Sequence, residues 1–358
     1  MAKKLAIDKV LFTVVVVLVV GGLVMVYSAN PPDPDGGFKR QFITQLAAAI
    51  VGLASMLVVM SIDYRRWARP WLVYLGLGVS LGLLGIVLTA PPINGSSRWL
   101  SVGPLTFQPS ELAKVAVILF LAYQIHRCPE AVSQPRVLVP CGVGVGLVTL
   151  LVLQAPDFGS AALILGIAAV MLFLAGLSWR WIVPGMLVFP ALLGLFIWSE
   201  PYRVERVMGF LSPETDPSGS GFQVLQSKIA IGSGGMVGQG LGESAQKLYF
   251  LPLATSDFIF SIVSEELGLI GAAAVLAAFV VLAWRGYLAG LRAPDAFGRF
   301  LAWGLTSALL IQALVNISVT VGLVPVTGTP LPFLSHGGSS LVMTLVACGL
   351  LLSVSEHG

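Results

Sequence analysis

The sequence predicts an all-α polytopic membrane protein with ten transmembrane helices and one large loop on the outer side. Two observations lead to this fold class, the composition and the length of the apolar runs. Of 358 residues, 56% are hydrophobic and only 10% are charged, whereas soluble proteins carry about 25% charged residues. The apolar residues fall in runs long enough to cross a bilayer, about 17–25 residues each. The net charge of +3, without a basic stripe, argues against nucleic acid as a partner.

The predicted spans follow one another with short connectors, so residues 1–358 are expected to form a single integral membrane domain. The ten spans are Val10–Ser28, Phe42–Ser61, Trp71–Thr89, Ser110–Ile125, Val137–Gln154, Ser160–Leu177, Trp181–Trp198, Phe258–Trp284, Phe300–Gly322 and Phe333–Val354. No cleavable signal precedes the first span, which is expected to act as an uncleaved signal anchor. An even number of spans places both termini on the same side.

The distribution of basic residues predicts the orientation. Twelve of the 20 Lys and Arg residues lie in one set of connectors, seven lie in the other set, and Lys114 lies inside a span. Short cytoplasmic loops are the ones enriched in Lys and Arg. We therefore expect cytoplasmic termini and an extracytoplasmic loop at Ser199–Asp257.

This outer loop, between the seventh and eighth spans, is long, polar and rich in glycine. Its backbone groups would go unpaired in hydrocarbon, so it must lie outside the bilayer or line a wet cavity. Within it, Tyr202–Leu211 and Phe222–Ile231 show the apolar periodicity of short amphipathic helices at a membrane interface. The following GSGGMVGQGLG, residues 232–242, is either a flexible loop or a segment that closely approaches a ligand or helix ends.

Two charged residues fall inside the fourth span, where an ionisable side chain is a functional candidate. Glu111 and Lys114 are three residues apart and so share one helical face. They either neutralise each other or line a polar cavity in which Lys114 meets an anion. Ser110 follows a proline at the start of this helix, a position that favours helix initiation.

Further charged residues are expected on the outer face: Asp257, Asp157, Arg98 and Lys247. Cations suit a phosphate-bearing substrate, and a nearby carboxylate suits a general base. Asp157 either caps the sixth span or lines the cavity. Glu265 and its neighbour Glu266 lie within the eighth span, where one of them is expected to cap or pair internally.

Any metal is expected to be a hard cation held by carboxylates, as Mg²⁺ and Mn²⁺ prefer. His336 has no second His or Cys near it in the sequence, which excludes a zinc site there. No organic cofactor is expected.

Five segments resemble the SEDS family (shape, elongation, division and sporulation). They are RWLSVGPLTFQPSELAK (98–114), APDFGS (155–160), GSGFQVLQSKIAIGSGGMVGQGLGESAQKL (219–248), SDFIFSIVSEELGLIGA (256–272) and TGTPLPFLSHGGSS (327–340). They cover both halves of the chain in the family's order. The runs DPSGSGFQVLQS and ESAQKL favour the FtsW-type division branch over the RodA-type elongation branch.

The resemblance implies a peptidoglycan glycosyltransferase that polymerises lipid II on the outer face of the cytoplasmic membrane. Asp257 matches the family's essential acid and would act as general base in an inverting transfer, with undecaprenyl pyrophosphate as leaving group. Arg98 and Lys114 would compensate the charge of the leaving group, and Gln246 and Lys247 would contact substrate. A divalent cation is implied as well, with Asp157 as a candidate ligand.

The implied partners are lipid II, a class B penicillin-binding protein and other divisome or elongasome membrane proteins. A lipid II flippase and a non-catalytic scaffold are the competing functions. The chain departs from the family pattern at two places. The family's P-E-A-H-T-D is here Pro252–Asp257, PLATSD, which lacks the His of a proton relay. The family's S-Y-G-G-S-S has His336 in place of the tyrosine.

Overall fold

The computed structural model describes residues 7–30, 40–91, 97–102, 105–198, 201–211, 220–247, 251 and 254–357. Helices make up most of the described chain. They are α1 (Lys9–Ala29), α2 (Arg40–Ser61), α3 (Pro70–Thr89), α4 (Pro109–Arg127), α5 (Pro135–Gln154), α6 (Phe158–Leu174), α7 (Trp179–Trp198), α8 (Pro201–Leu211), α9 (Ser220–Ser233), α10 (Ile259–Arg292), α11 (Ala296–Thr320) and α12 (Gly338–His357). The 3₁₀ turns η1 and η2 span Tyr64–Ala68 and Pro129–Ala131.

A short antiparallel hairpin precedes α4 and was not foreseen in the sequence. Its strands are β1 (Leu100–Val102) and β2 (Leu105–Phe107), with Ser101 opposite Thr106. Strands of three residues are too short for a recognisable alternation of apolar and polar residues. The hairpin turns the chain from Arg98 directly into the start of α4.

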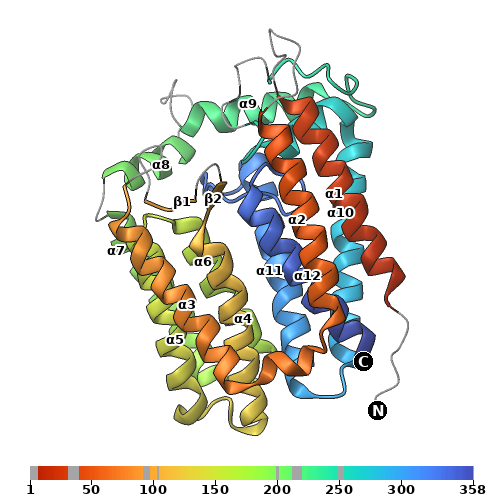
Figure 1. Cartoon of the computed structure of the whole chain (residues 1–358). Helices are drawn as coiled ribbons and strands as arrows, with labels where there is room; N and C mark the ends of the chain where they lie inside the picture. Colours follow the sequence, from red (N-terminus) through yellow and green to blue (C-terminus); the bar gives the residue numbers. More distant parts are fainter. Residues whose placement is uncertain are drawn as a thin grey trace.

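The long helices form two groups that stand side by side (Figure 1). Helices α3 to α7 make one group, and α1, α2, α10, α11 and α12 make the other. Helix α4 joins the groups, because it packs against α11 and α12 as well as α3, α5 and α6. Helices α8 and α9 lie across one end of the molecule, while α12 ends at the opposite end, where α1 begins. The start of α1 and the end of α12 therefore lie at the same end of the described chain.

Each of the ten predicted spans overlaps a helix of the structure. Within the part of the chain that the structure describes, seven of these helices are long and apolar enough to cross a membrane. The seven are α1, α2, α3, α5, α10, α11 and α12. Helix α6 is apolar but has 17 residues, and α4 carries Glu111 and Lys114. The chain is a multi-pass membrane protein, and the exact number of ten crossings stays a prediction.

The last predicted span begins too early in the sequence. Phe333 was expected inside it, but α12 begins at Gly338. Two prolines, Pro330 and Pro332, lack the N–H groups that a helix needs, and Phe333 has a φ of 68°, outside the helical region. Residues Thr329–Gly337 instead form a turn before α12, at the end of the molecule where α8 and α9 lie. That end is called the outer end below, after the predicted orientation, and the turn is called the outer turn.

The eighth predicted span, Phe258–Trp284, is a broken helix. Helix α10 extends to Arg292, and within it Gly268 has a φ of 65° and a ψ of −165°. Only glycine adopts such backbone angles readily. The break separates Ile259–Leu267, which carries Glu265 and Glu266, from the longer apolar part that follows.

The glycine-rich segment closes this break. Leu269 and Ile270 donate their amides to the carbonyls of Gly235 and Met236, at 2.9 and 3.3 Å. In return, the carbonyls of Glu265 and Glu266 accept the amides of residues 239 and 240, each at 3.0 Å. Buried backbone groups must be paired, so the segment supplies the partners that the interrupted helix cannot. Of the alternatives left open by the sequence, close approach to a helix is the correct one.

A steric test distinguishes this packing from mere flexibility. A Cβ on Gly238 would overlap the carbonyl oxygen of Glu266, whereas a Cβ on Gly242 would meet nothing within 4 Å. Both glycines have positive φ, 86° and 84°, so Ala costs about 1–2 kcal/mol of backbone strain at either position. We expect Gly238→Ala to lose about 1–3 kcal/mol more than Gly242→Ala through overpacking. Thermal unfolding in detergent measures the difference, and equal Tm values would contradict the close contact.

Both amphipathic segments of the outer loop are helical. Tyr202–Leu211 falls within α8, and Phe222–Ile231 falls within α9. Helix α9 rests on the outer ends of two long helices, because the Ser227 hydroxyl bonds to the Ser261 hydroxyl and to the Thr320 carbonyl, each at 2.6 Å. The remaining predictions for this loop, at residues 199–200, 212–219, 248–250 and 252–253, lie outside the described residues.

Candidate functional site

Asp257 lies just before α10, half-buried, on a segment whose backbone is fixed from two sides. The Nδ2 of Asn316 on α11 donates to the carbonyl of Asp257 and to that of Thr329, each at 2.8 Å. The two preceding carbonyls accept from the outer turn: the His336 amide donates to Thr255 at 2.8 Å, and the Ser335 hydroxyl donates to Ser256 at 2.5 Å. These bonds hold the carboxylate in place without using its oxygens.

Arg98 and Asp257 both lie beside Gly328. A Cβ on Gly328 would lie 3.9 Å from Nη1 of Arg98 and 3.9 Å from Oδ2 of Asp257. The Arg98 guanidinium also donates through Nη2 to the carbonyl of Pro156. Glycine leaves the space beside both groups open. The structure thus brings together the carboxylate and one of the cations that the sequence singled out.

Asp157 is the N-cap of α6, and both of its carboxylate oxygens accept hydrogen bonds. Its Oδ1 accepts from the amide of Ser160 at 3.2 Å, which caps the helix. Its Oδ2 accepts from Gln108 Nε2 at 2.8 Å and from the Ser110 hydroxyl at 3.0 Å. Asp157 is 4% exposed. Capping is therefore the role that the structure supports, and Ser110 acts by tying the start of α4 to that of α6.

The start of α6 also touches the segment beside Asp257. A Cβ on Gly159 would overlap the Thr329 methyl group and lie 2.9 Å from the Thr327 carbonyl oxygen. Four of the five segments that resemble the SEDS family, at Arg98, Asp157, Asp257 and Thr329, therefore converge at this place.

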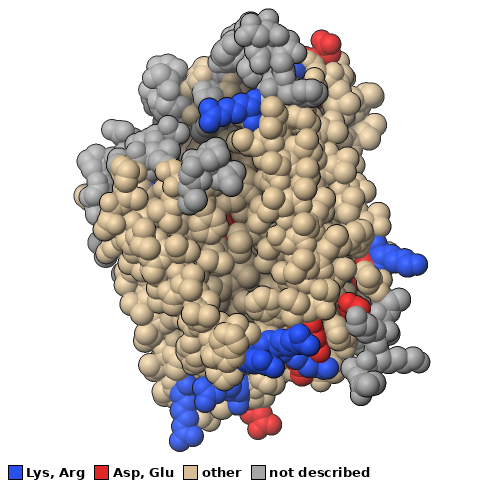
Figure 2. Space-filling model, viewed as in Figure 1, with Lys and Arg blue, Asp and Glu red and all other residues tan. Residues whose placement is uncertain are grey.

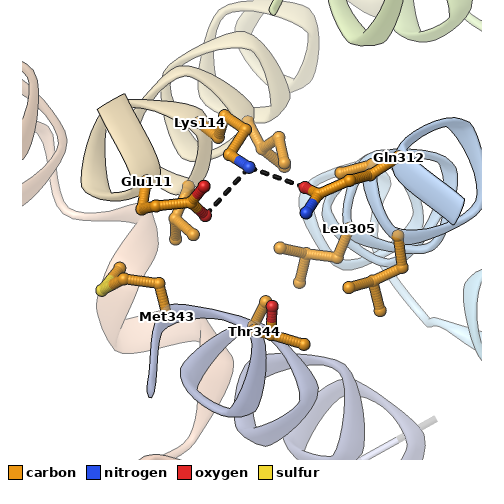
Figure 3. A pocket seen from close by; sticks show the side chains of 11 residues that line it. Glu111, Lys114, Leu305, Gln312, Met343 and Thr344 are labelled. Atoms are coloured by element: carbon orange, nitrogen blue, oxygen red, sulfur yellow. Dashed lines mark hydrogen bonds and ion pairs between the residues drawn. The ribbon is translucent and has the colours of Figure 1, made fainter. Parts of the chain in front are cut away.

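Glu111 and Lys114 form a buried ion pair on α4 (Figure 3). Lys114 Nζ lies 2.9 Å from Glu111 Oε2 and donates to Gln312 Oε1 on α11 at 2.6 Å. The two charged side chains are only 4% and 8% exposed. Gln312 in turn donates through Nε2 to the Pro330 carbonyl at 2.9 Å. This chain of bonds links the pair inside the bundle to the outer turn that holds the Asp257 segment.

A small cavity of about 30 Å³ lies beside the ion pair, between α4, α11 and α12. Its walls are mostly apolar, with Thr344 and Met343 facing Glu111 (Figure 3). A cavity of this size holds one or two water molecules, not a sugar. Figure 2 shows the surface hollowed between the two helix groups, with acidic atoms visible at its floor.

Three other predicted site residues belong to a separate cluster, at the break in α10. Lys247 Nζ lies 3.3 Å from Oε1 of Glu266, and Oε2 of the same carboxylate accepts a hydrogen bond from the Ser28 hydroxyl at 2.5 Å. Glu265 accepts from the Ser244 hydroxyl at 2.5 Å and from the amide of residue 245 at 3.1 Å. Both glutamates therefore pair internally, as the sequence predicted for one of them. Gln246 Oε1 is buried without a partner among the described residues.

The described residues do not form a metal site around Asp157. Among them, no three His, Cys, Asp or Glu side chains lie close enough together to hold an ion. Both Asp157 oxygens already accept hydrogen bonds. The donor set thus does not fit the expectation of Asp157 as a ligand.

Substitutions at Asp157 separate capping from metal binding. Asn is as good an N-cap as Asp, whereas Ala costs about 0.5–2 kcal/mol. We expect Asp157→Ala to lower the Tm in detergent. Asp157→Asn should lower it less, because the amide keeps the helix cap but replaces the acceptor of Gln108 and Ser110 with an N–H donor. If Asp157 is instead a metal ligand, Asp157→Asn should weaken the affinity for the cation by roughly 10–100-fold. Loss of Mn²⁺ binding in a stable Asp157→Asn variant, followed by electron paramagnetic resonance, would count against the capping account.

Two amides that organise the site, Gln312 and Asn316, were not among the residues predicted from the sequence. They are four residues apart, on one face of α11, and both are buried, at 5% and 1% exposed. Polar residues aligned on one face of an apolar helix commonly mark interhelical hydrogen bonds. That spacing was the available signal.

The sequence matches the family model of the cell cycle proteins FtsW, RodA and SpoVE over residues 8–358. It is 42% identical over 356 residues to the probable peptidoglycan glycosyltransferase FtsW of Geobacter metallireducens, covering 98% of this chain and 95% of that protein. It is also 42% identical to stage V sporulation protein E of Bacillus subtilis, covering 99% and 98%.

Solved structures show the same fold. The rod shape determining protein RodA of Thermus thermophilus superposes with a TM-score of 0.72 at 30% identity, over 98% of this chain and 97% of that one. A chain of a peptidoglycan synthase complex, solved in work on the coordination of polymerization and crosslinking, gives a TM-score of 0.82 at 34% identity, over 98% of both chains.

Proposed function

This chain belongs to the FtsW, RodA and SpoVE family of cell cycle proteins, and on that premise we propose that it polymerises lipid II into glycan strands. Relatives at 42% identity over nearly the whole chain are named peptidoglycan glycosyltransferases, which supports the same enzyme class here. The observation that carries the proposal is the placement of both Arg98 and Asp257 beside Gly328. A general base and a cation for a phosphate are the two groups this reaction needs.

In the proposed reaction, Asp257 accepts the proton of the sugar 4-hydroxyl of one lipid II. The deprotonated oxygen forms a bond to the anomeric carbon of the growing strand, and the configuration at that carbon inverts. The bond from that carbon to the pyrophosphate oxygen breaks, and undecaprenyl pyrophosphate leaves with the electron pair. The half-buried setting of Asp257 suits a base that must meet both substrate and water. No histidine stands in the PLATSD segment before it to relay the proton.

The leaving group gathers negative charge, and fixed cations stabilise it best when they are already in place. The Arg98 guanidinium is anchored by its hydrogen bond to the Pro156 carbonyl and, like Asp257, it lies beside Gly328. This position supports a role for Arg98 in binding the pyrophosphate. Lys114 is held by Glu111 and Gln312, so its charge would act through the field of the site rather than by direct contact. Lys247 would have to leave Glu266 to contact substrate.

A divalent cation stays part of the proposal without a protein site of its own. Mg²⁺ commonly binds through substrate phosphates and only one or two carboxylates. The described residues do not provide a cluster of ligands, so the substrate phosphates would supply most of its coordination.

We place the active site on the outer face of the cytoplasmic membrane, with both termini inside. On the face shown in Figure 2, Lys and Arg side chains gather mainly at the end opposite α8 and α9, which agrees with a cytoplasmic location for that end. The similarity to a chain of a peptidoglycan synthase complex supports a class B penicillin-binding protein as partner. The FtsW-named relatives favour a role in division over elongation.

The test is polymerisation of purified lipid II by the purified protein, with its cognate transpeptidase, with and without chelator. Glycan strands resolved by gel electrophoresis are the expected product. Absence of polymer from the wild-type protein under all of these conditions would remove the proposal.

A lipid II flippase is the second candidate, since the buried pair of Glu111 and Lys114 would also suit a translocation path. Labelled lipid II in liposomes distinguishes the two functions. Transport that survives Asp257→Ala, in a protein that makes no polymer, would favour the flippase.

A further inference from the structure

The outer turn bonds to α2 as well as to the Asp257 segment. Gln45 lies near the outer end of α2 and is 1% exposed. Its Nε2 donates to the Ser335 carbonyl at 3.0 Å, and its Oε1 accepts from the Gly337 amide at 3.0 Å. Both polar atoms of one side chain therefore hold the same turn, which neither an apolar nor a shorter side chain can do.

The same turn holds the two carbonyls that precede Asp257. The Ser335 hydroxyl accepts from the Leu331 amide at 2.8 Å and donates to the Ser256 carbonyl at 2.5 Å. The His336 amide donates to the Thr255 carbonyl at 2.8 Å. Residues 335–337 thus join α2 on one side to the start of α10 on the other.

A second contact fixes the turn against α2. Thr44 Oγ1 lies 3.2 Å from His336 Nε2 and also donates to the Gln41 carbonyl at 2.9 Å. Because the hydroxyl has one proton, the imidazole must donate through Nε2. Burial lowers the pKa of His336, so the ring is neutral at neutral pH and can keep this tautomer.

We propose that Gln45 is a positioning residue for Asp257, acting from α2 through the hydrogen bonds of Ser335 and His336. The inference rests on the proposed function for its kinetic consequence. Among the described residues, the Gln45 side chain bonds only to the turn. Removing its amide group therefore lets the Asp257 segment shift while the Asp257 carboxylate remains present.

The kinetic test uses Gln45→Met, which keeps the length of the side chain and removes both polar atoms. A misplacement of about 1 Å costs up to roughly 100-fold in rate. We expect kcat for lipid II polymerisation to fall about 10–100-fold while KM changes less than about threefold, since the lost interaction concerns alignment in the transition state. Gln45→Glu keeps the acceptor for the Gly337 amide and should recover part of kcat.

The matched control is Gln124→Met, on α4. Gln124 is also a buried glutamine, 5% exposed, and its Nε2 donates to the Tyr74 hydroxyl at 3.3 Å. We expect wild-type kcat from this variant. Ser335→Ala combined with Gln45→Met should cost less than the product of the single effects, because both act on one path. Wild-type kcat in a folded Gln45→Met protein, or fully multiplicative effects, would overturn the inference.

Hydrogen–deuterium exchange gives a readout that needs no activity. In Gln45→Met, amides of residues 335–337 and of the segment around 255–258 should exchange at least about tenfold faster than in wild type, while α4 is unchanged. Unchanged exchange around Asp257 would contradict the inference even in an inactive preparation. Absence of polymer from the wild-type protein would contradict the proposed function instead, so the two failures are distinguishable.

Discussion

Asp257→Asn should abolish glycan polymerisation while leaving the fold intact. The amide cannot accept a proton from the sugar hydroxyl, and loss of a general base typically costs about 10²–10⁴-fold in rate. The backbone at this position is held through its carbonyl by Asn316, which the substitution leaves in place. The measurement is the initial rate of strand formation from lipid II, together with the Tm of wild type and variant in the same detergent.

Two further substitutions serve as controls for Asp257→Asn. Ser256→Ala changes the neighbouring side chain, while the Asp257 carboxylate and the Ser256 carbonyl that accepts from Ser335 remain, so activity should fall far less than in Asp257→Asn. Asp257→Glu keeps the base but displaces it and should fall between wild type and Asp257→Asn. Polymerisation at the wild-type rate by Asp257→Asn would remove Asp257 as the base.

Lys114→Met should destabilise the protein strongly, because it leaves the Glu111 carboxylate buried without its ion-pair partner. Breaking a buried pair from one side costs about 3–5 kcal/mol. Glu111→Gln combined with Lys114→Met should restore most of the stability, since no charge then remains to be compensated. An exposed pair provides the control: Arg65 lies 3.2 Å from Asp295 with its side chain 42% exposed, and Arg65→Met should cost about 1 kcal/mol or less.

The double variant also separates the two interpretations of the pair that the sequence left open. If the charge of Lys114 stabilises the leaving pyrophosphate through the field of the site, the double variant is stable and polymerises more slowly, by less than the loss of about 10²–10³-fold that is typical of a donor in direct contact. We expect this outcome. Recovery of both stability and activity would show instead that the pair serves only to neutralise itself.

Much of the fold follows from patterns that the lipid environment enforces. All ten apolar runs overlap helices, because a backbone in hydrocarbon must satisfy its own hydrogen bonds. The break at Gly268 could not be predicted from the same pattern. An isolated glycine in an apolar run is common, and this break depends on a partner segment about 30 residues earlier in the chain.

The site was predictable in its residue types and not in its connections. Asp257 and Arg98 were identified from charge at the ends of apolar runs, and the structure brings them together at Gly328. Lys247 has the same charge as Arg98 and was also expected on the outer face, yet it pairs with Glu266. Which carboxylate a lysine meets is decided by tertiary packing, and sequence spacing carries no information about it.

The broken helix also affects how the protein is built. The part of α10 from Gly268 to Arg292 has 25 residues, about 37 Å of helix at 1.5 Å per residue, which by itself exceeds the hydrocarbon thickness of about 30 Å. Glu265 and Glu266 therefore need not enter the lipid during insertion. The glycine-rich segment precedes α10 in the chain, so we expect it to be translocated first and to meet these glutamates as the helix arrives. We therefore expect the order of assembly to follow the order of synthesis.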